Sequence, residues 1–488
     1  MGRMRDTGRS IANWLDERLH FTKLYNSTAG HTIPSASASW WYVLGSATLV
    51  CFVIQVLTGI CLALVYVPSP AQAYESLEYL NYTQPFGWFL RALHSWSSNF
   101  MVGLITLHMI QVFLFGAYKY PRELTWIVGC VLFLCTIAMA FTGQVLRFDQ
   151  DAYWALQIVM SVLGRVPLVG ADLLHLIQGG PIVASETLSR FFTLHVFVVP
   201  GLIIALLTVH LRLVLTRGIN EYPVPEEGVD PATYDEDYEK LLKKTGIRFF
   251  PDGADKDVIF ASLVITAIVL FAAIFGPSGP NGPADPALIH TVPRPDFFFL
   301  SLFAAFALMP PYMESFVIVY IMPVAVILLF LVPFISNRGE KHPSRRPGSV
   351  ILTVMVMTTL TVLAVLGLTS PWSPHMNAWS GDPVQPQFVK GRTPLELVGA
   401  SVMQEKQCRN CHSLDGLGGK RGPELADVAT RLTYNQLVRQ VLQGGGNMPA
   451  YGKHLKPPEV SALVAFLYTL HPELEPPARN SAQPAVPH

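Results

Sequence analysis

Four regularly spaced histidines are the residues of this chain most suited to chemistry. His94 and His108 lie 14 residues apart in one apolar stretch, and His195 and His210 lie 15 apart in another. In a helix, 14 steps return to within roughly 40° of the starting face, and 15 steps overshoot it by roughly 60°. Each helix therefore presents two imidazoles on nearly one face, about 21–22 Å apart along its axis.

Two such helices side by side form two bis-histidine sites, stacked across a membrane. If both helices run in the same direction, His94 pairs with His195, and His108 pairs with His210. A bis-imidazole site without an open position suits a haem that transfers electrons. Satisfied packing or a proton relay is the alternative, but four histidines at matched levels favour function. We expect two non-covalent b-type haems.

A second motif predicts covalent haem attachment. Cys408-Arg409-Asn410-Cys411-His412 is the C-x-x-C-H signature, in which Cys408 and Cys411 bind the haem vinyl groups and His412 binds iron. Downstream, Met448 lies in the loop Gly444-Gly445-Gly446-Asn447-Met448-Pro449 and resembles the sixth ligand of a class I cytochrome c. His/Met ligation raises the reduction potential, as an acceptor above b haems requires.

Long apolar helices must position the histidines, and the sequence supplies them. Only 14% of the 488 residues are charged, whereas soluble proteins carry about 25%. The net charge of zero gives no indication of nucleic-acid binding. A membrane helix needs about 20 apolar residues. Seven stretches qualify, near 38–66, 88–117, 124–146, 188–215, 258–276, 315–336 and 349–370, and the shorter stretch 297–309 is expected at the interface.

Basic residues gather on one side of these spans if the spans alternate in direction. They are Arg3, Arg5, Arg9, Lys119, Arg122, Arg338, Lys341, Arg345 and Arg346, whereas loop 67–87 on the other side has no Lys or Arg. The positive-inside rule places the N-terminus in the cytoplasm. We therefore expect a bacterial inner-membrane protein whose residues after 370 are periplasmic.

The predicted fold class is an all-α membrane protein. We expect a cytoplasmic amphipathic segment (1–37), a four-helix di-haem domain (38–217), a three-helix domain (218–370), a linker (371–394) and a small all-α cytochrome c domain (395–488).

Glycines repeat the histidine spacing in the first and third spans: Gly45 and Gly59, Gly129 and Gly143. A haem face needs close backbone approach, which glycine permits, although small residues also serve ordinary helix contacts. Arg91, one turn before His94, is placed to pair with a haem propionate.

Several motifs carry a family resemblance: Gln55-x-x-Thr58-Gly59, Arg91-x-x-His94, Thr142-Gly143 with Asp149-Gln150, and Thr187-x-x-Arg190-Phe191-x-x-x-His195. Through them, residues 40–217 resemble the four-helix haem-binding half of cytochrome b. Residues 249–370 resemble its second half, the separate subunit IV of the plastid-type complex.

The resemblance implies an outer site that oxidises quinol. The family motif Pro-Glu-Trp-Tyr corresponds here to Pro295-Asp296-Phe297-Phe298, so Asp296 is expected to take a quinol proton. On the sequence alone, an aspartate that caps the following helix is the alternative. Tyr153 is expected to line the same pocket. The family's Leu-Pro-Trp is replaced by Leu146-Arg147-Phe148, and an arginine at this edge is expected to tune the outer haem.

The resemblance also implies an inner site that reduces quinone. Asp257 is expected to deliver a proton there, and Arg212 is a nearby basic candidate. Ordinary charges at the cytoplasmic edge are the alternative for both residues.

The function implied by the resemblance is a quinol:acceptor oxidoreductase of the cytochrome bc type, which translocates protons by a Q cycle. No Rieske cysteine–histidine pattern occurs in this sequence, so we expect a separate Rieske iron–sulfur protein, a soluble or membrane-bound cytochrome acceptor, and a homodimer within a larger complex. One alternative is a di-haem conduit that passes electrons to a partner enzyme without splitting them. A haem carrier or sensor is a weaker alternative.

Overall fold

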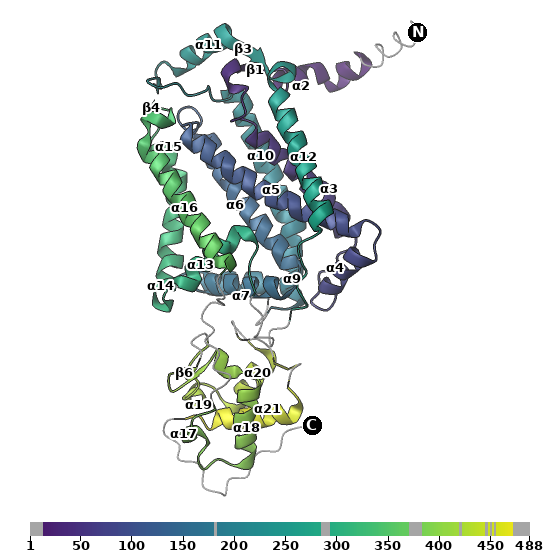
Figure 1. Ribbon diagram of the computed structural model, residues 1–488, viewed down its shortest axis with the longest axis vertical. Helices are drawn as coiled ribbons and strands as arrows, with labels where there is room; N and C mark the ends of the chain where they lie inside the picture. The colour runs from purple at the N-terminus through teal and green to yellow at the C-terminus, as the bar shows by residue number, and fades with distance from the viewer. Residues whose placement is uncertain are drawn as a thin grey trace.

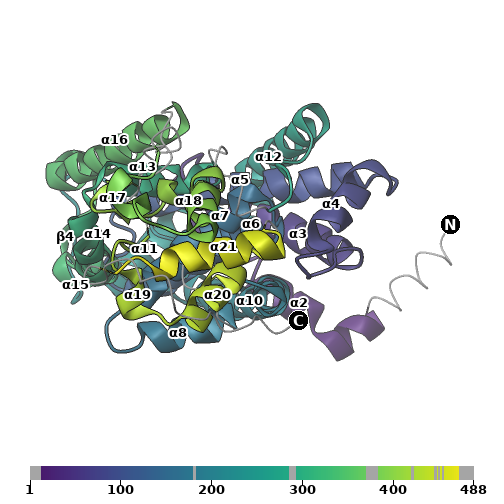
Figure 2. The same cartoon turned by 90° about the horizontal axis from the view of Figure 1, so that it is seen from below.

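The computed structural model describes residues 13–179, 183–284, 293–369, 383–418, 422–444, 448, 451–452 and 455–471. Several residues named above lie outside these ranges: Arg3, Arg5, Arg9, Gly445, Gly446, Asn447 and Pro449. Figure 1 shows a bundle of long helices with a smaller helical unit below it. Seen from below in Figure 2, the smaller unit lies within the outline of the bundle, with α16 and α4 near opposite edges.

Seven helices are long and apolar enough to cross a membrane, which confirms the predicted number among the described residues. They are α3 (Leu44–Ala63), α5 (Gly87–Leu114), α6 (Glu123–Leu146), Ser185–Arg217, α12 (Asp255–Phe275), Met313–Ile335 and α16 (Pro347–Thr369). The fourth consists of α9 (Ser185–Thr193), η2 (Leu194–Val198) and α10 (Val199–Arg217). The sixth contains the end of α14 (Pro311–Phe316), η5 (Val317–Ile321) and α15 (Met322–Ile335).

Short elements cover both ends of the bundle. One end carries α4 (Ala73–Tyr82), α7 (Gln150–Gly164), α8 (Gly170–Gln178), η4 (Phe297–Phe299) and α13 (Leu300–Leu308). The other carries α2 (Phe21–Ser27), β1 (Thr32–Pro34), η1 (Ser35–Ser37), β2 (Gly228–Val229), α11 (Tyr234–Thr245), β3 (Gly246–Arg248), η3 (Phe249–Gly253), β4 (Gly339–Glu340) and η6 (Pro343–Arg345). Strand β1 pairs antiparallel with β3, and β2 pairs antiparallel with β4.

The first four spans form the part of the bundle that holds the histidines. Helix α3 packs along α5, and α10 packs along α6. Their shared core is apolar, since it contains Ala47, Cys51, Phe52, Met101, Leu104, Val128, Leu132 and Ile203, together with Val264 and Ile268 of α12. Burial of these side chains holds the four helices around a central space.

A buried ionic network joins this part to the last three spans. Lys341 Nζ donates to Glu221 Oε1 at 2.5 Å and to Asn220 Oδ1 at 2.7 Å. Arg122 Nη1 donates to the Tyr234 hydroxyl at 2.6 Å, and that hydroxyl donates to Glu221 Oε2 at 2.7 Å. Burial alone would raise the pKa of Glu221, but Lys341 and Arg122 outweigh it and leave the pKa below its usual range. Burial lowers the pKa of Lys341 to about 8, so its ammonium stays charged at pH 7.

The C-terminal unit has its own apolar core. It consists of α17 (Pro386–Val389), α18 (Pro394–Glu405), η7 (Cys408–Asn410), β5 (Ser413–Leu414), β6 (Leu417–Gly418), α19 (Val428–Arg431), α20 (Tyr434–Gln443) and α21 (Pro457–Tyr468). Helices α18 and α21 cross closely at Gly399, where a Cβ would lie only 2.0 Å from the Ala462 carbonyl oxygen. The absence of a side chain at this glycine therefore permits the crossing. Val384, Phe388 and Val389 pack on this core. The predicted linker 371–394 is therefore too long, since its last residues belong to the folded unit.

We predict that Lys341→Met lowers the free energy of unfolding by about 3 kcal/mol, because it leaves the largely buried Glu221 carboxylate without its closest cation. Thermal unfolding of the detergent-solubilised protein measures the effect. Lys243→Met is the control, because Lys243 is 80% exposed in its pair with Glu239, and its loss should cost no more than about 0.5 kcal/mol. Equal melting temperatures for the two variants would contradict the role of the network.

Candidate functional site

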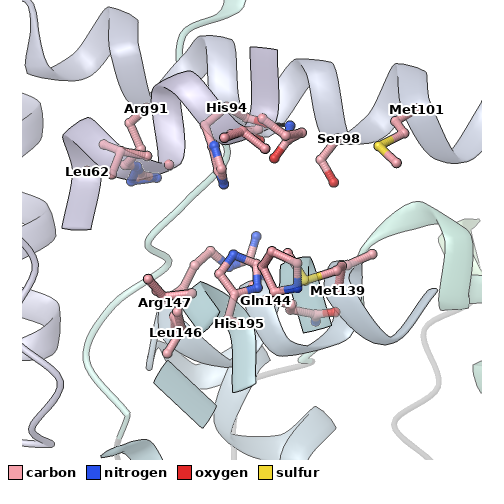
Figure 3. A pocket seen from close by; sticks show the side chains of 18 of the residues that line it. Leu62, Arg91, His94, Ser98, Met101, Met139, Gln144, Leu146, Arg147 and His195 are labelled. Carbon is pink, nitrogen blue, oxygen red and sulfur yellow. Dashed lines mark hydrogen bonds between the residues drawn. The ribbon is translucent and has the colours of Figure 1, made fainter. Parts of the chain in front are cut away.

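His94 and His195 face each other inside the bundle. His94 lies on α5, and His195 lies in η2, a π-helical turn of the fourth span. Their ring centroids are 6.2 Å apart, a spacing that accommodates two metal–nitrogen bonds of about 2 Å each between the rings. Figure 3 shows the two imidazoles on opposite walls of one cavity. The structure thus brings together the first histidine of each predicted pair.

Threonine hydroxyls fix which nitrogen of each ring remains available. Thr58 Oγ1 donates to the Ile54 carbonyl and lies 2.8 Å from His94 Nδ1. Its oxygen therefore accepts from Nδ1–H, which leaves the Nε2 lone pair of His94 free. Thr142 Oγ1 lies 3.0 Å from His195 Nδ1 and acts in the same way. Such hydrogen bonds orient imidazoles that bind metals.

The cavity between the two rings is mainly apolar. Its lining includes Phe52, Val56, Ile60, Leu62, Met101, Val102, Met139 and Ile203. Arg91 and Arg147 line it as well, on opposite walls in Figure 3. A flat apolar macrocycle with charged propionates matches this combination of lining groups. The residues present therefore fit a haem bound between His94 and His195.

The glycines with histidine-like spacing lie against the four imidazoles. A Cβ on Gly143 would lie 2.8 Å from His195 Cε1, and one on Gly59 would lie 3.2 Å from His94 Cε1. The corresponding distances are 3.4 Å from Gly45 to His108 Cε1 and 3.5 Å from Gly129 to His210 Cε1. The glycines thus make room for the histidine rings on the neighbouring helix. The backbone of each glycine therefore comes close to a histidine ring of the neighbouring span.

His108 and His210 repeat this arrangement toward the other end of the bundle. His108 follows His94 on α5 by 14 residues, or about 21 Å of helix. The ring of His108 packs on α3, and that of His210 packs on α6.

The predicted quinol-site carboxylate forms an ion pair. Asp296 Oδ1 accepts from Arg147 Nη1 at 3.0 Å. Asp296 precedes η4 but makes no side-chain cap hydrogen bond, so the alternative of a helix cap is wrong. Burial raises the pKa of Asp296, whereas Arg147 opposes that shift. Tyr153, predicted to line the same pocket, is not among the described residues that line the cavity. It is buried on α7 against Phe148, and its hydroxyl accepts from Gln157.

The predicted inner-site residues are only partly brought together. Ser46 Oγ on α3 donates to Asp257 Oδ1 on α12 at 2.5 Å, which ties this half-buried carboxylate to the first span. Arg212 is exposed on α10, so it does not belong to this contact.

The C-x-x-C-H segment has a comparable donor set. His412 Nδ1 lies 2.8 Å from the Pro423 carbonyl oxygen, and since a carbonyl only accepts, Nε2 of His412 is left free. Burial lowers the pKa of His412, which keeps the imidazole neutral. Cys408 and Cys411 are not joined by a disulfide, so both sulfurs are available for thioether bonds to a haem. Met448 packs on the C-terminal core, and its sulfur accepts from Gln440 Nε2 at 3.5 Å. These residues fit a covalently bound haem.

Sequence reasoning missed the partners that orient these groups. Thr58 and Thr142 each immediately precede a glycine that contacts a histidine, so the repeated Thr-Gly dipeptide is a signal that could have identified them. Arg91 donates to the carbonyls of Ser278 and Gly279. Nothing in the sequence pairs Arg91 with Ser278 or Gly279, because they are far apart along the chain.

Comparisons with known proteins agree with this geometry. Residues 30–218 match the family "Cytochrome b/b6/petB", and residues 396–467 match "Cytochrome C oxidase, cbb3-type, subunit III". The chain is 42% identical to cytochrome b6 of Synechococcus sp. (strain JA-3-3Ab) over 210 residues, which are 43% of this chain and 97% of that protein. It is 39% identical to cytochrome b6 of Heliobacterium modesticaldum, over 43% of this chain and 99% of that protein.

A solved structure is also similar. A chain of a "Hyperthermophilic respiratory Complex III" superposes with a TM-score of 0.61 at 28% identity. The match covers 74% of this chain and 92% of the other.

We predict that Gly143→Ala removes about half of the b-type haem absorbance, because the added methyl group would displace the His195 ring and one of the two expected b haems would lose this ligand. Optical spectra of the purified protein measure it. Gly103→Ala is the matched control, since a Cβ there meets nothing within 4 Å. Full b-haem content in both variants would show that His195 tolerates displacement and would count against this site.

Proposed function

The chain belongs to the cytochrome b family, and we propose that it is the haem-carrying membrane subunit of a quinol oxidoreductase with a fused c-type haem as electron exit. The observation that carries the proposal is the pair His94 and His195, which face each other across an apolar cavity with Asp296 at its edge. Groups suited to electron transfer, His94 and His195, and a group suited to proton removal, Asp296, therefore line the same cavity.

Three haems are proposed, each with its own ligands. His94 with His195 hold the outer b haem, and His108 with His210 hold the inner one. In the C-terminal domain, Cys408 and Cys411 would hold the c haem covalently, and His412 with Met448 would bind its iron. When bound, the haems supply reversible one-electron transfer. The Nε2 atoms left free by Thr58, Thr142 and Pro423 support the assignments of His94, His195 and His412.

Asp296 acts as the proton acceptor for quinol at the outer site. Quinol oxidation releases two electrons and two protons, and a carboxylate at the cavity edge can take a proton from a hydroxyl within hydrogen-bond reach. The buried Tyr153 supports the wall of this site through α7. At the opposite end, Asp257 delivers a proton to quinone, and its contact with Ser46 holds the carboxylate beside the first span. Arg212 supplies positive charge at that edge.

A Q cycle distributes the electrons in this proposal. One electron would pass by way of the two b haems to the inner quinone, and the other would pass to a separate Rieske iron–sulfur protein and then to the c haem. A cytochrome acceptor oxidises the c haem, and the subunit works as a homodimer within a larger complex. The likeness to a chain titled as respiratory Complex III supports this assembly.

The proposed orientation puts the N-terminus in the cytoplasm and the C-terminal domain in the periplasm of a bacterial inner membrane. The loop charges support it. So does the position of the C-terminal unit in Figure 1, beneath the bundle end that carries α7 and α13.

A di-haem conduit without electron splitting is the second candidate. The ion pair between Arg147 and Asp296 favours it, because Arg147 opposes the rise in the pKa of Asp296 that burial causes and so makes the carboxylate a weaker base than it would be without this partner.

Two b haems and one c haem are expected in a redox titration of the purified protein followed by optical spectra. The two b haems should titrate separately, because one lies at each end of the bundle. The finding of a single b haem, or of no c haem, would overturn the proposal.

We predict that Asp296→Asn slows quinol-driven reduction of the haems by about 10²-fold or more, since the amide cannot take a proton. Stopped-flow reduction by a quinol analogue measures the rate. Asp230→Asn on the opposite end of the bundle serves as the control and should retain the wild-type rate. An unchanged rate for Asp296→Asn, at full haem content, would favour the conduit.

A further inference from the structure

Arg147 occupies a position between two sites. It follows the last residue of α6, four residues after the Gly143 that contacts His195. Its side chain is 13% exposed and lines the same cavity as His94 and His195. In Figure 3 it lies beside His195 on one wall of that cavity. One guanidinium therefore borders the proposed outer haem and also contacts the proposed quinol-site carboxylate.

Two carboxylates hold the guanidinium in a fixed orientation. Arg147 Nε lies 3.5 Å from Asp149 Oδ2, and Nη1 lies 3.0 Å from Asp296 Oδ1. Asp149 is fully buried and is itself anchored, because it accepts from the backbone nitrogens of Ala152 and Asn281. Asp149 is therefore the fixed support of Arg147, whereas Asp296 is 26% exposed and lines the cavity.

The other charged groups around Asp296 are already engaged. Arg91 on α5 donates to the carbonyls of Ser278 and Gly279. Asp151 on α7 accepts from Asn281 Nδ2 and from the Arg294 backbone nitrogen. Arg147 is thus the cation that contacts the Asp296 carboxylate directly.

We infer that Arg147 is a positioning residue that links the outer haem to the proton acceptor of quinol, so that the charge on Asp296 and the reduction potential of that haem depend on each other. The inference rests on the function proposed above. A positive charge beside the cavity favours the reduced haem, because reduction lowers the positive charge at iron. The Asp296 carboxylate offsets much of that charge while the ion pair is intact.

Protonation of Asp296 changes this balance. When quinol gives a proton to the carboxylate, the Arg147 charge is no longer neutralised, and acceptance of an electron in the adjacent cavity becomes more favourable. Of the two protons and two electrons that quinol loses, one proton goes to Asp296 and one electron would go to the outer haem, and the second proton and second electron would go to the Rieske partner. Loss of the proton and transfer of the electron from one quinol therefore assist each other.

Arg147→Gln tests the link through the equilibrium potentials of the two b haems, measured with chemical mediators in the purified protein and without quinol. We expect the reduction equilibrium of the outer haem to shift at least tenfold toward the oxidised form, about 59 mV for a one-electron couple. The inner haem should not shift. Arg345→Gln is the control, because it removes an arginine paired with Glu226 at the opposite end of the bundle.

Two further variants separate charge from geometry. Arg147→Lys keeps the charge and should retain most of the potential, but an ammonium lacks the fork that contacts both carboxylates, so quinol oxidation should slow through kcat. Asp296→Asn should shift the outer haem toward the reduced form, and by a smaller factor when Arg147 is also Gln, because the partner is then absent. Arg147→Lys also keeps the test valid if Arg147→Gln fails to bind haem.

An outer-haem potential in Arg147→Gln equal to that in Arg345→Gln would overturn the inference, as would equal shifts of both b haems. Strictly additive effects of Arg147→Gln and Asp296→Asn would also contradict it. These outcomes differ from failure of the proposed function, in which quinol would not reduce the wild-type haems although their potentials still respond to Arg147.

Discussion

Buried imidazoles whose second nitrogen is left free are the feature on which the rest of this structure depends. An unpaired polar nitrogen is costly in an apolar bundle, and iron at that nitrogen removes the cost. Thr58 and Thr142 satisfy the Nδ1 atoms of the outer pair. Glycines on α3 and α6 make room for the rings, and α5 and the fourth span, which contains η2 and α10, bring them into position. Side-chain size and polarity along four helices are thereby constrained together.

The two ends of the bundle use charge in different ways. At the end of the bundle that carries α2 and α11 (Figure 1), a closed network joins the first four spans to the last three. It consists of Lys341, Arg122 and Glu221. At the other end, Arg147 and Asp296 are also paired, but they border a cavity. The same type of interaction is therefore structural where it is enclosed, and it is suited to chemistry where a cavity reaches it.

The C-terminal domain repeats the principle of the histidine sites in the bundle. His412 has its Nδ1 fixed by the Pro423 carbonyl, and the domain's apolar core supports Met448. The domain forms its own core because Gly399 lets α18 and α21 cross closely. This small folded unit lies next to the end of the bundle that carries α7 and α13 (Figure 1).

The sequence by itself determined the seven spans, because their length and hydrophobicity are local properties. It also determined that His94 pairs with His195, because the spacing of the histidines sets their helix face and the common direction of the two spans sets their level. It also located the C-x-x-C-H segment. Tertiary structure alone decided that Asp296 pairs with Arg147 instead of capping η4, and that Arg212 remains exposed while Asp257 meets Ser46. It also placed the last residues of the predicted linker in the C-terminal core. The physical reason is that such contacts join residues up to 211 positions apart, and the direction of a side chain depends on which distant groups the fold brings beside it.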